Sequence, residues 1–401
     1  MNKAVELKKN IFWCGALDYD IKTFDIVMAT DYGTTYNAYV VKGAAKTALI
    51  EVSKDRFFDE FASRVKSISF NDLDYIVLNH TEPDHSGALG KLLELYPNAT
   101  VVGSKTAVRF LKKIVNKSFK SLTVEEGDTL DLGGMTLKFI SAPFLHWPDS
   151  MFTYLEEEKV LFSCDFLGCH YCTDKVTNDK IDDLSYGQSF KYYFDVIMSP
   201  FKPYVLQALD KIDKLEVDMV CTGHGAVLVT EIEKYKELYR IWSTKPPRSK
   251  TPLVSVVFVS AYGYTEEIAR EIAKGISDVA VNAELINLVE HDVSEVIEKI
   301  QQSQGFLIGS PTINGDTLPP VWELLSELNP IVYKGVFAGA FGSFGWSGEA
   351  PANIEARLKQ LKLNIPAPPL KINFKANEDE LKQAFEYGRE FAIIVKNAEK
   401  A

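Results

Sequence analysis

Long hydrophobic runs and clusters of basic residues are both absent from this sequence. The longest apolar stretches, such as residues 253–262, are well short of the ~20 residues that a membrane-spanning helix needs. Residues 1–9 lack the apolar core of a secretory signal. Lysine and arginine are scattered along a chain whose formal net charge is −11, which argues against a nucleic-acid-binding surface. We therefore expect a cytoplasmic protein that has neither membranes nor nucleic acids as partners.

Cysteine is also scarce. Five cysteines in a chain of 401 residues are an odd number, so a disulfide framework is not expected. Cys169 and Cys172 form a C-x-x-C pair, but the second pair that a rubredoxin-like or zinc site requires is missing. We interpret these two as incidental thiols, and the sequence leaves a redox role open as the alternative.

What the chain does contain is the composition of a folded protein of two domains. Hydrophobic residues make up 46% and charged residues 25%, which excludes a disordered chain. Residues 243–252 are polar and rich in proline, and they are interpreted as a short, stiff linker. The predicted domains are therefore residues 1–249 and 250–401.

The first domain contains a group of metal-ligand side chains directly after an apolar strand, residues 75–78. His80, Glu82, Asp84 and His85 alternate within six residues, an arrangement that can hold two metal ions from opposite sides of one turn. The alternative is a polar loop whose aspartate or serine caps the following helix. We favour the metal site because further candidate ligands follow along the chain.

Three more candidate ligands each stand at the end of a predicted strand or loop. His146 follows the motif by 61 residues, Asp165 closes the strand at 160–164 after another 19, and His224 comes 59 later between two glycines. A single His or Asp at a strand end usually caps an element or bonds to backbone. Together with the first motif, they predict a dinuclear metal site.

The predicted elements of the two domains differ in pattern. In the first, strands come in groups, including a hairpin that turns at Gly43, which suggests two sheets with helices outside. In the second, five strands alternate with helices from residue 253 onward, which predicts a doubly wound parallel sheet. The ligand site of such a sheet lies at the carboxyl ends of its strands.

Three loops are predicted at those ends. The first combines hydroxyls, backbone N–H groups and a helix N-terminus, which suits a phosphate, and the third holds a tryptophan in a glycine-rich turn. The glycine spacing is not that of a dinucleotide site. Ordinary strand–helix turns are the alternative. The loops comprise Ser260, Ala261, Tyr262, Gly263, Tyr264 and Thr265; Ser310, Pro311, Thr312, Ile313, Asn314 and Gly315; and Ser343, Phe344, Gly345, Trp346, Ser347 and Gly348.

These motifs resemble two known folds. The first domain is similar to the metallo-β-lactamase fold, an αββα sandwich with its metal site at one edge of two sheets. The hydrolases of that family carry H-x-H-x-D-H, whereas this chain has Glu82 in place of the second histidine. A carboxylate there makes the site harder and more anionic, which favours iron over zinc. The three loops of the second domain resemble the phosphate and isoalloxazine loops of flavodoxins, which bind FMN.

In this order the two halves resemble the flavodiiron proteins, or A-type flavoproteins, over essentially the whole chain. The resemblance implies FMN and two irons as cofactors, and reduction of O2 to water, NO to N2O, or both. It implies that Asp165 bridges the irons, and leaves open whether His85 binds iron. The other ligands would be His80, Glu82 and His146 on one iron, and Asp84, His85 and His224 on the other.

The resemblance also implies partners. No rubredoxin or NAD(P)H-reductase domain is seen before the end at Ala401, so we expect an external electron donor, such as a rubredoxin-like protein or a reduced deazaflavin. A head-to-tail homodimer, alone or as a dimer of dimers, would bring FMN of one chain to the diiron site of the other. A metal-dependent hydrolase with a passenger flavodoxin domain and an electron carrier with a structural metal site are the rival hypotheses. His170 lies near Asp165 in sequence, and its role is left open.

Overall fold

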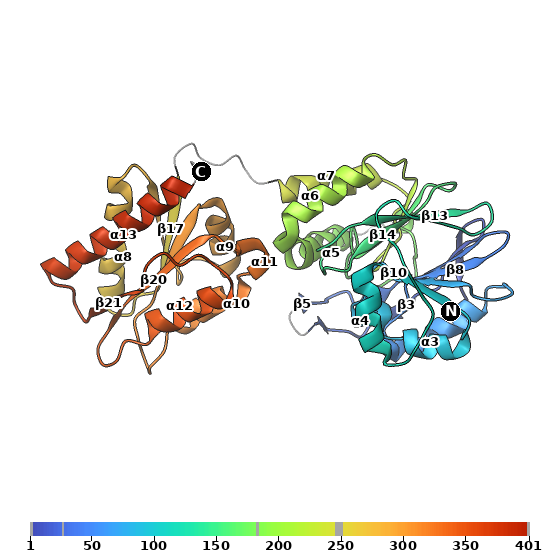
Figure 1. The fold of residues 1–401 in the computed structure, drawn as a ribbon, viewed down its shortest axis with the longest axis horizontal. Helices are drawn as coiled ribbons and strands as arrows, with labels where there is room; N and C mark the ends of the chain where they lie inside the picture. Colours follow the sequence, from blue (N-terminus) through green and yellow to red (C-terminus); the bar gives the residue numbers. More distant parts are fainter. Residues whose placement is uncertain (1–2, 26–27, 182–183, 245–251, 399–401) are drawn as a thin grey trace. The chain divides into compact units, whose positions relative to one another are not determined.

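The computed structural model describes residues 3–25, 28–181, 184–244 and 252–398 (Figure 1). The chain divides into two compact units, Met1–Thr244 and Lys245–Ala401. The segment interpreted as a linker, and with it the predicted boundary at residue 249, falls mainly on residues 245–251, outside the described residues. Among the helices of the described ranges, none combines the length and apolarity needed to cross a membrane.

The first unit contains two main sheets. One has seven strands in the order β1-β2-β7-β8-β9-β10-β11, and the other has five in the order β12-β13-β14-β15-β16. The strands of the first are β1 (Val5–Lys8), β2 (Ile11–Trp13), β7 (Tyr39–Lys42), β8 (Thr47–Ile50), β9 (Tyr75–Val77), β10 (Thr100–Gly103) and β11 (Ser121–Thr123). Those of the second are β12 (Thr129–Asp131), β13 (Thr136–Ser141), β14 (Met151–Leu155), β15 (Val160–Cys164) and β16 (Met219–Thr222). Two small ribbons pair β3 (Ala16–Asp18) with β6 (Thr34–Tyr36) and β4 (Thr23–Phe24) with β5 (Met28–Ala29).

Alternate residues of these strands pack on opposite faces, because side chains of a strand point alternately to its two sides. Val40 of β7 and Ile76 of β9 belong to a cluster that includes α1, α3 and α4. Their neighbours Val41 and Val77 belong to a second cluster, shared with Phe162 of the other sheet. A third cluster joins the outer face of that sheet to α5, α6 and α7. The layers are thus helices, sheet, sheet, helices, and the predicted αββα sandwich is confirmed.

The helices of the first unit vary in length. They are η1 (Asp55–Phe57), α1 (Phe58–Lys66), α2 (Pro83–Ser86), α3 (Leu89–Leu95), α4 (Lys105–Val115), η2 (Asn178–Lys180), α5 (Leu184–Tyr193), η3 (Phe194–Met198), η4 (Ser199–Phe201), α6 (Lys202–Ile212) and α7 (Ile232–Ser243). The short α2 was not predicted, and it lies inside the ligand motif. Pro83 suits its first turn because the missing N–H of proline would be unpaired there anyway. The sequence predicts that Gly87 opens the next helix, but in the structure Gly87 ends α2.

The second unit is built on a parallel sheet of five strands in the order β18-β17-β19-β20-β21. Its strands are β17 (Leu253–Phe258), β18 (Asn282–Asn287), β19 (Gly305–Gly309), β20 (Phe337–Phe344) and β21 (Leu370–Asn373). Its helices are α8 (Tyr264–Asp278), α9 (Val293–Gln302), α10 (Pro319–Glu327), α11 (Pro330–Tyr333), α12 (Ala350–Gln360) and α13 (Glu378–Ala398). One apolar cluster lies on each face of the sheet, with α8 and α13 on one side and α9, α10 and α12 on the other. The predicted doubly wound, flavodoxin-like fold is confirmed.

Local boundaries differ from the sequence prediction where tertiary pairing decides them. The hairpin at Gly43 is present, since β7 and β8 pair antiparallel from Lys42 to Thr47. The apolar residues 336–341 predict a strand that stops at 341, yet β20 continues to Phe344 because its last residues pair with β21. The mainly apolar residues 217–220 predict a second strand, and the structure places it at Met219–Thr222, paired in parallel with β15.

Candidate metal and flavin sites

The seven predicted metal ligands lie in loops that follow four strands of the first unit. His80 comes shortly after β9, and Asp165 directly follows β15. His146 is reached from β13 and His224 from β16. The loop after β9 continues into α2, which carries Asp84 and His85. The two sheets therefore bring together residues that are up to 144 positions apart in sequence.

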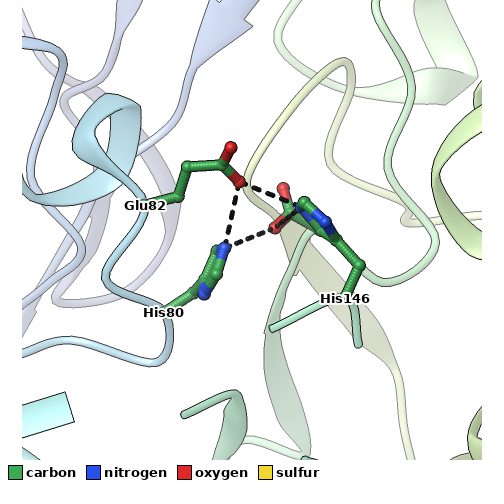
Figure 2. Close-up of side chains that lie close together, drawn as sticks. His80, Glu82 and His146 are labelled. Carbon is green, nitrogen blue, oxygen red and sulfur yellow. Dashed lines mark hydrogen bonds and ion pairs between the residues drawn. The ribbon is translucent and has the colours of Figure 1, made fainter. Parts of the chain in front are cut away.

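The first group of ligand atoms consists of His80, Glu82 and His146, which converge in Figure 2. Oε2 of Glu82 lies 3.1 Å from Nε2 of His80 and 2.9 Å from Nε2 of His146. These two imidazole nitrogens lie 3.6 and 3.7 Å from Oδ2 of Asp165. All four ligand atoms are within 4.8 Å of one another, so they can share one ion.

The second group consists of Asp84, His85 and His224. Oδ2 of Asp84 lies 3.3 Å from Nε2 of His85 and 3.1 Å from Nε2 of His224. Oδ1 of Asp165 lies 3.0 Å from the same nitrogen of His85 and 3.4 Å from that of His224. Asp165 therefore turns one carboxylate oxygen to each group.

This arrangement fits two metal ions. Ligand atoms about 2.1 Å from one ion and at right angles to one another are about 3 Å apart, close to the spacings found here. Within the described ranges of the chain, both carboxylate oxygens of Asp84 and Oδ2 of Asp165 are buried without a hydrogen-bond partner. Buried polar atoms are normally paired, and unpaired carboxylate oxygens facing imidazoles are explained by cations between them. The mixed nitrogen and oxygen donor set suits iron.

The charges of the site reinforce this interpretation. Burial alone would lower the pKa of His85, but the charge of Asp84 beside it raises that pKa well above its usual value. Burial would raise the pKa of Asp165 and of Glu82, yet attraction to His85 and a hydrogen bond from His146, respectively, hold these two pKa values below the usual range. Glu82 and Asp165 are therefore ionised at neutral pH, and they offer negative charge to bound cations.

Two supporting residues were not predicted from the sequence. Asp149 accepts hydrogen bonds from the backbone N–H and the hydroxyl of Thr81, at 2.8 and 2.7 Å, and lies 3.4 Å from Nδ1 of His80. It can therefore orient that imidazole. The sequence alone predicts that Tyr193 belongs to the core or a pocket wall, but in the structure its hydroxyl donates to Oδ1 of Asp165 at 3.1 Å. The one feature of the sequence that could have pointed to either residue was the proximity of Asp149 to His146.

A further carboxylate lies behind His85. Glu51 directly follows β8, and its Oε1 accepts the backbone N–H of Asn79 at 3.0 Å. Ligand-type atoms of Glu51, His85 and Cys164 lie within 4.8 Å of one another. Burial raises the pKa of Glu51 to about 7. The sequence offered no signal for this contact, because Glu51 stands at the end of a strand far from the motif.

In the second unit, the three predicted loops surround a cavity of about 470 Å³ at the carboxyl edge of the sheet. Tyr262 and Trp346 stand at its rim with 83% and 92% of their surface exposed, so both rings are free to stack on a flat ligand. Of the predicted contacts, those that line it are Tyr262, Tyr264, Pro311, Thr312, Ile313, Asn314, Gly315, Ser343, Phe344, Gly345, Trp346 and Ser347. Its size and mixed lining suit a cofactor with a ring system.

The remaining predicted flavin residues lie outside the cavity wall. The hydroxyl of Ser260 accepts the backbone N–H groups of Gly263 and Glu266, at 3.1 and 3.3 Å, and so shapes the turn before α8. Gly263 has φ +85°, a conformation that side-chain-bearing residues rarely adopt, and it immediately precedes the helix. Thr265 is 2.8 Å from Ser343 through their hydroxyl oxygens. The others outside the wall are Ala261, Ser310 and Gly348.

Phe374 lines the cavity and was missed. It directly follows β21, and its ring lies beside Gly345, where an added Cβ would approach it to 2.8 Å. An exposed aromatic residue after the last parallel strand was the signal that could have found it, because all such strand ends share one edge.

Fold and sites together define a class of protein: a metallo-β-lactamase-like domain with a carboxylate-rich dinuclear centre, joined to a flavodoxin-like domain. Residues 34–225 match the family described as ODP family beta lactamase, and residues 256–388 match the flavodoxin family. The chain is 45% identical to the flavo-diiron protein FprA2 of Clostridium acetobutylicum, over 97% of this chain and 99% of that one.

Two further comparisons agree. The anaerobic nitric oxide reductase flavorubredoxin of Vibrio vulnificus is 33% identical, with 97% of this chain and 80% of that one covered. The structure of rubredoxin oxygen:oxidoreductase from Desulfovibrio gigas superposes with a TM-score of 0.66 at 26% identity, covering both chains fully. This chain belongs to the flavodiiron protein family, whose cofactors are FMN and a diiron site. It is an oxidoreductase.

Proposed function

We propose that this enzyme takes electrons from an external donor through FMN to its diiron site, and there reduces O2 to water, NO to N2O, or both. The observation that carries the proposal is the carboxylate of Asp165, whose two oxygens each face one complete group of ligands. The proposal draws its substrates from the relatives, one of which is an oxygen oxidoreductase and another a nitric oxide reductase.

In the proposed centre, His80, Glu82 and His146 hold one iron, and Asp84, His85 and His224 hold the other, with Asp165 shared. FMN, when bound, would supply redox chemistry in steps of one or two electrons, and the irons would supply the site at which the gas is reduced. The chain's own contribution is electrostatic and geometric. Its carboxylates offset the positive charge of the irons, and Tyr193 holds the orientation of Asp165 with its hydroxyl.

For FMN, the proposed contacts are the three loops at the carboxyl edge of the second sheet. The N-terminus of α8 would attract the phosphate through its dipole and its free N–H groups, and no basic side chain of the described residues lines the cavity there. Tyr262 and Trp346 would stack on the ring system. Phe374 adds an aromatic wall that the loops alone do not supply.

The electron donor, location, assembly and domain boundary of the enzyme are part of the same proposal. The donor is a separate rubredoxin-like protein or a reduced small cofactor, in keeping with the relative that acts as a rubredoxin oxygen:oxidoreductase. The protein works in the cytoplasm, as a head-to-tail homodimer or a dimer of such dimers. The domain boundary lies at about residue 249, within the proline-rich segment.

A stopped-flow experiment tests the function directly. The protein, loaded with FMN and iron and reduced without oxygen, is mixed with O2 or with NO while flavin absorbance is followed. We expect the flavin to be reoxidised by at least one of the gases at catalytic rates, because electrons leave FMN through the irons. Protein that contains FMN but no iron is the control. Equal reoxidation rates with and without iron, for both gases, would contradict the proposal.

Replacing Glu82 with histidine tests why this site prefers iron. The change recreates the ligand pattern of the zinc hydrolases, and a softer ligand shifts the preference toward zinc. We expect lower iron occupancy, more zinc and loss of gas reduction in Glu82→His, with FMN content unchanged. Metal analysis of protein produced in cells supplied with both metals measures the iron and zinc contents. Unchanged iron content and turnover would show that the carboxylate does not decide metal choice.

A further inference from the structure

His224 is linked, on the side away from the proposed irons, to groups that the mechanism above does not use. Its Nε2 faces the site, where it lies 3.1 Å from Asp84. Its Nδ1 lies 2.6 Å from the backbone carbonyl oxygen of Thr35. A carbonyl oxygen only accepts hydrogen bonds, so Nδ1 of His224 carries the proton and Nε2 has its lone pair free for iron.

The hydroxyl of Thr34 extends this contact. Oγ1 of Thr34 is fully buried, 3.3 Å from Nδ1 of His224 and 2.7 Å from Nδ1 of His170. The other acceptor near this hydroxyl is the carbonyl oxygen of Thr35, at a longer 3.4 Å. The short contact assigns the hydroxyl proton: Thr34 donates to His170, and its oxygen faces the N–H of His224.

This direction fixes the tautomer of His170. Its Nδ1 accepts a hydrogen bond, so its proton is on Nε2, and Nε2 is buried without a partner among the described residues. The ring is held between aromatic neighbours, with its centroid 4.3 Å from that of Phe24 and 4.9 Å from that of Tyr193. It has little freedom to turn and satisfy this N–H elsewhere.

A cavity of about 130 Å³ lies beside His170 and is large enough for water. Thr30, Asp31, Gln188 and Tyr192 line it together with His170. Close contacts of the Thr34 hydroxyl therefore link His170, beside this cavity, to His224.

We propose that Thr34 and His170 are positioning residues that orient His224 and set how strongly it donates to iron. This inference rests on the proposed function, because it takes His224 as an iron ligand. Groups behind a metal-binding histidine fix its ring and its basicity, and their loss lowers metal affinity about 10–100-fold. These groups behind His224 also change the reduction potential of the iron that His224 is proposed to hold.

The test uses the complete iron- and FMN-loaded protein and compares Thr34→Val, Thr34→Ser and His170→Phe. Valine keeps the shape of threonine without its hydroxyl, whereas serine keeps the hydroxyl. We expect Thr34→Val and His170→Phe to bind iron about tenfold more weakly in competition with a chelator. We also expect both to shift the reduction potential of the diiron site, with Thr34→Ser close to wild type in both measurements.

Thr30→Val is the matched control, since Thr30 lines the same cavity but its hydroxyl donates to the carbonyl oxygen of Ile21. A combined Thr34→Val and His170→Phe variant should bind iron no more weakly than either single variant, because both changes interrupt the same series of hydrogen bonds. Wild-type iron affinity and potential in Thr34→Val would overturn the inference, as would a serine variant as impaired as the valine variant. Wild-type protein without iron or turnover would instead overturn the proposed function.

Discussion

Replacing Asp165 with alanine is expected to remove nearly all iron from the protein while FMN stays bound. Oδ2 of Asp165 faces His80 and His146, and Oδ1 faces His85 and His224, so one change removes a ligand from both proposed irons. The remaining buried imidazoles and carboxylates would then hold two cations without the charge that lies between them. Iron analysis and flavin absorbance of the purified variant measure the two outcomes independently.

Asp84→Ala is the matched comparison for this prediction. Asp84 is a buried aspartate of the same centre, but its ligand atoms belong to the second group alone. The Asp84→Ala variant should bind one iron more weakly than the other, which leaves a partly occupied centre. Two tightly bound irons in Asp165→Ala, or equal iron loss in both variants, would contradict the bridging role.

Mixing two inactive variants is expected to restore gas reduction. One is Asp165→Ala, which keeps FMN, and the other combines Ser260→Asp with Thr265→Ala to exclude FMN through charge and lost support at the phosphate loop. The two cofactor sites lie in separate units of the chain, and electron transfer falls steeply with distance. In the proposed head-to-tail dimer, a mixed dimer holds one intact pair, FMN of one chain and iron of the other.

The expected size of this effect follows from counting. Random exchange makes half of the dimers mixed, and each mixed dimer keeps one of its two pairs, so recovery should reach about one quarter of wild-type activity. Each variant alone, carried through the same exchange procedure, is the control. Exchange demonstrated by mass spectrometry, together with no recovered activity, would show that electrons pass within a single chain.

The sequence was informative where ligands follow strands. His80, Glu82, Asp84 and His85 share one loop, and ordinary propensities place that loop after the apolar strand β9. His224 could be predicted from the sequence because glycines flank it at the end of β16. All seven predicted ligands lie together in the structure, but their assignment to individual irons remains a proposal.

Contacts between segments that are distant in the sequence could not be predicted from it. Tyr193 is 28 residues from Asp165, and Thr34 is 136 residues from His170. Their side chains meet through the packing of α5 and the small β3–β6 ribbon, and residue type alone gives no sign of that. Thr34 stands in a stretch that alternates like any half-buried strand. The same holds for Phe374, whose position depends on the register of β21 against β20.

The origin of the ligands in both sheets has a mechanical consequence. His80 is carried by the seven-stranded sheet, whereas Asp165 and His224 are carried by the five-stranded one. Irons held by the proposed ligands would therefore cross-link the two sheets, closing chain loops in the way that a disulfide does, and such closure restricts the unfolded chain. All five cysteines are free and buried, so these thiols contribute no cross-link. Without iron, the sheets would be held mainly by the apolar cluster between them.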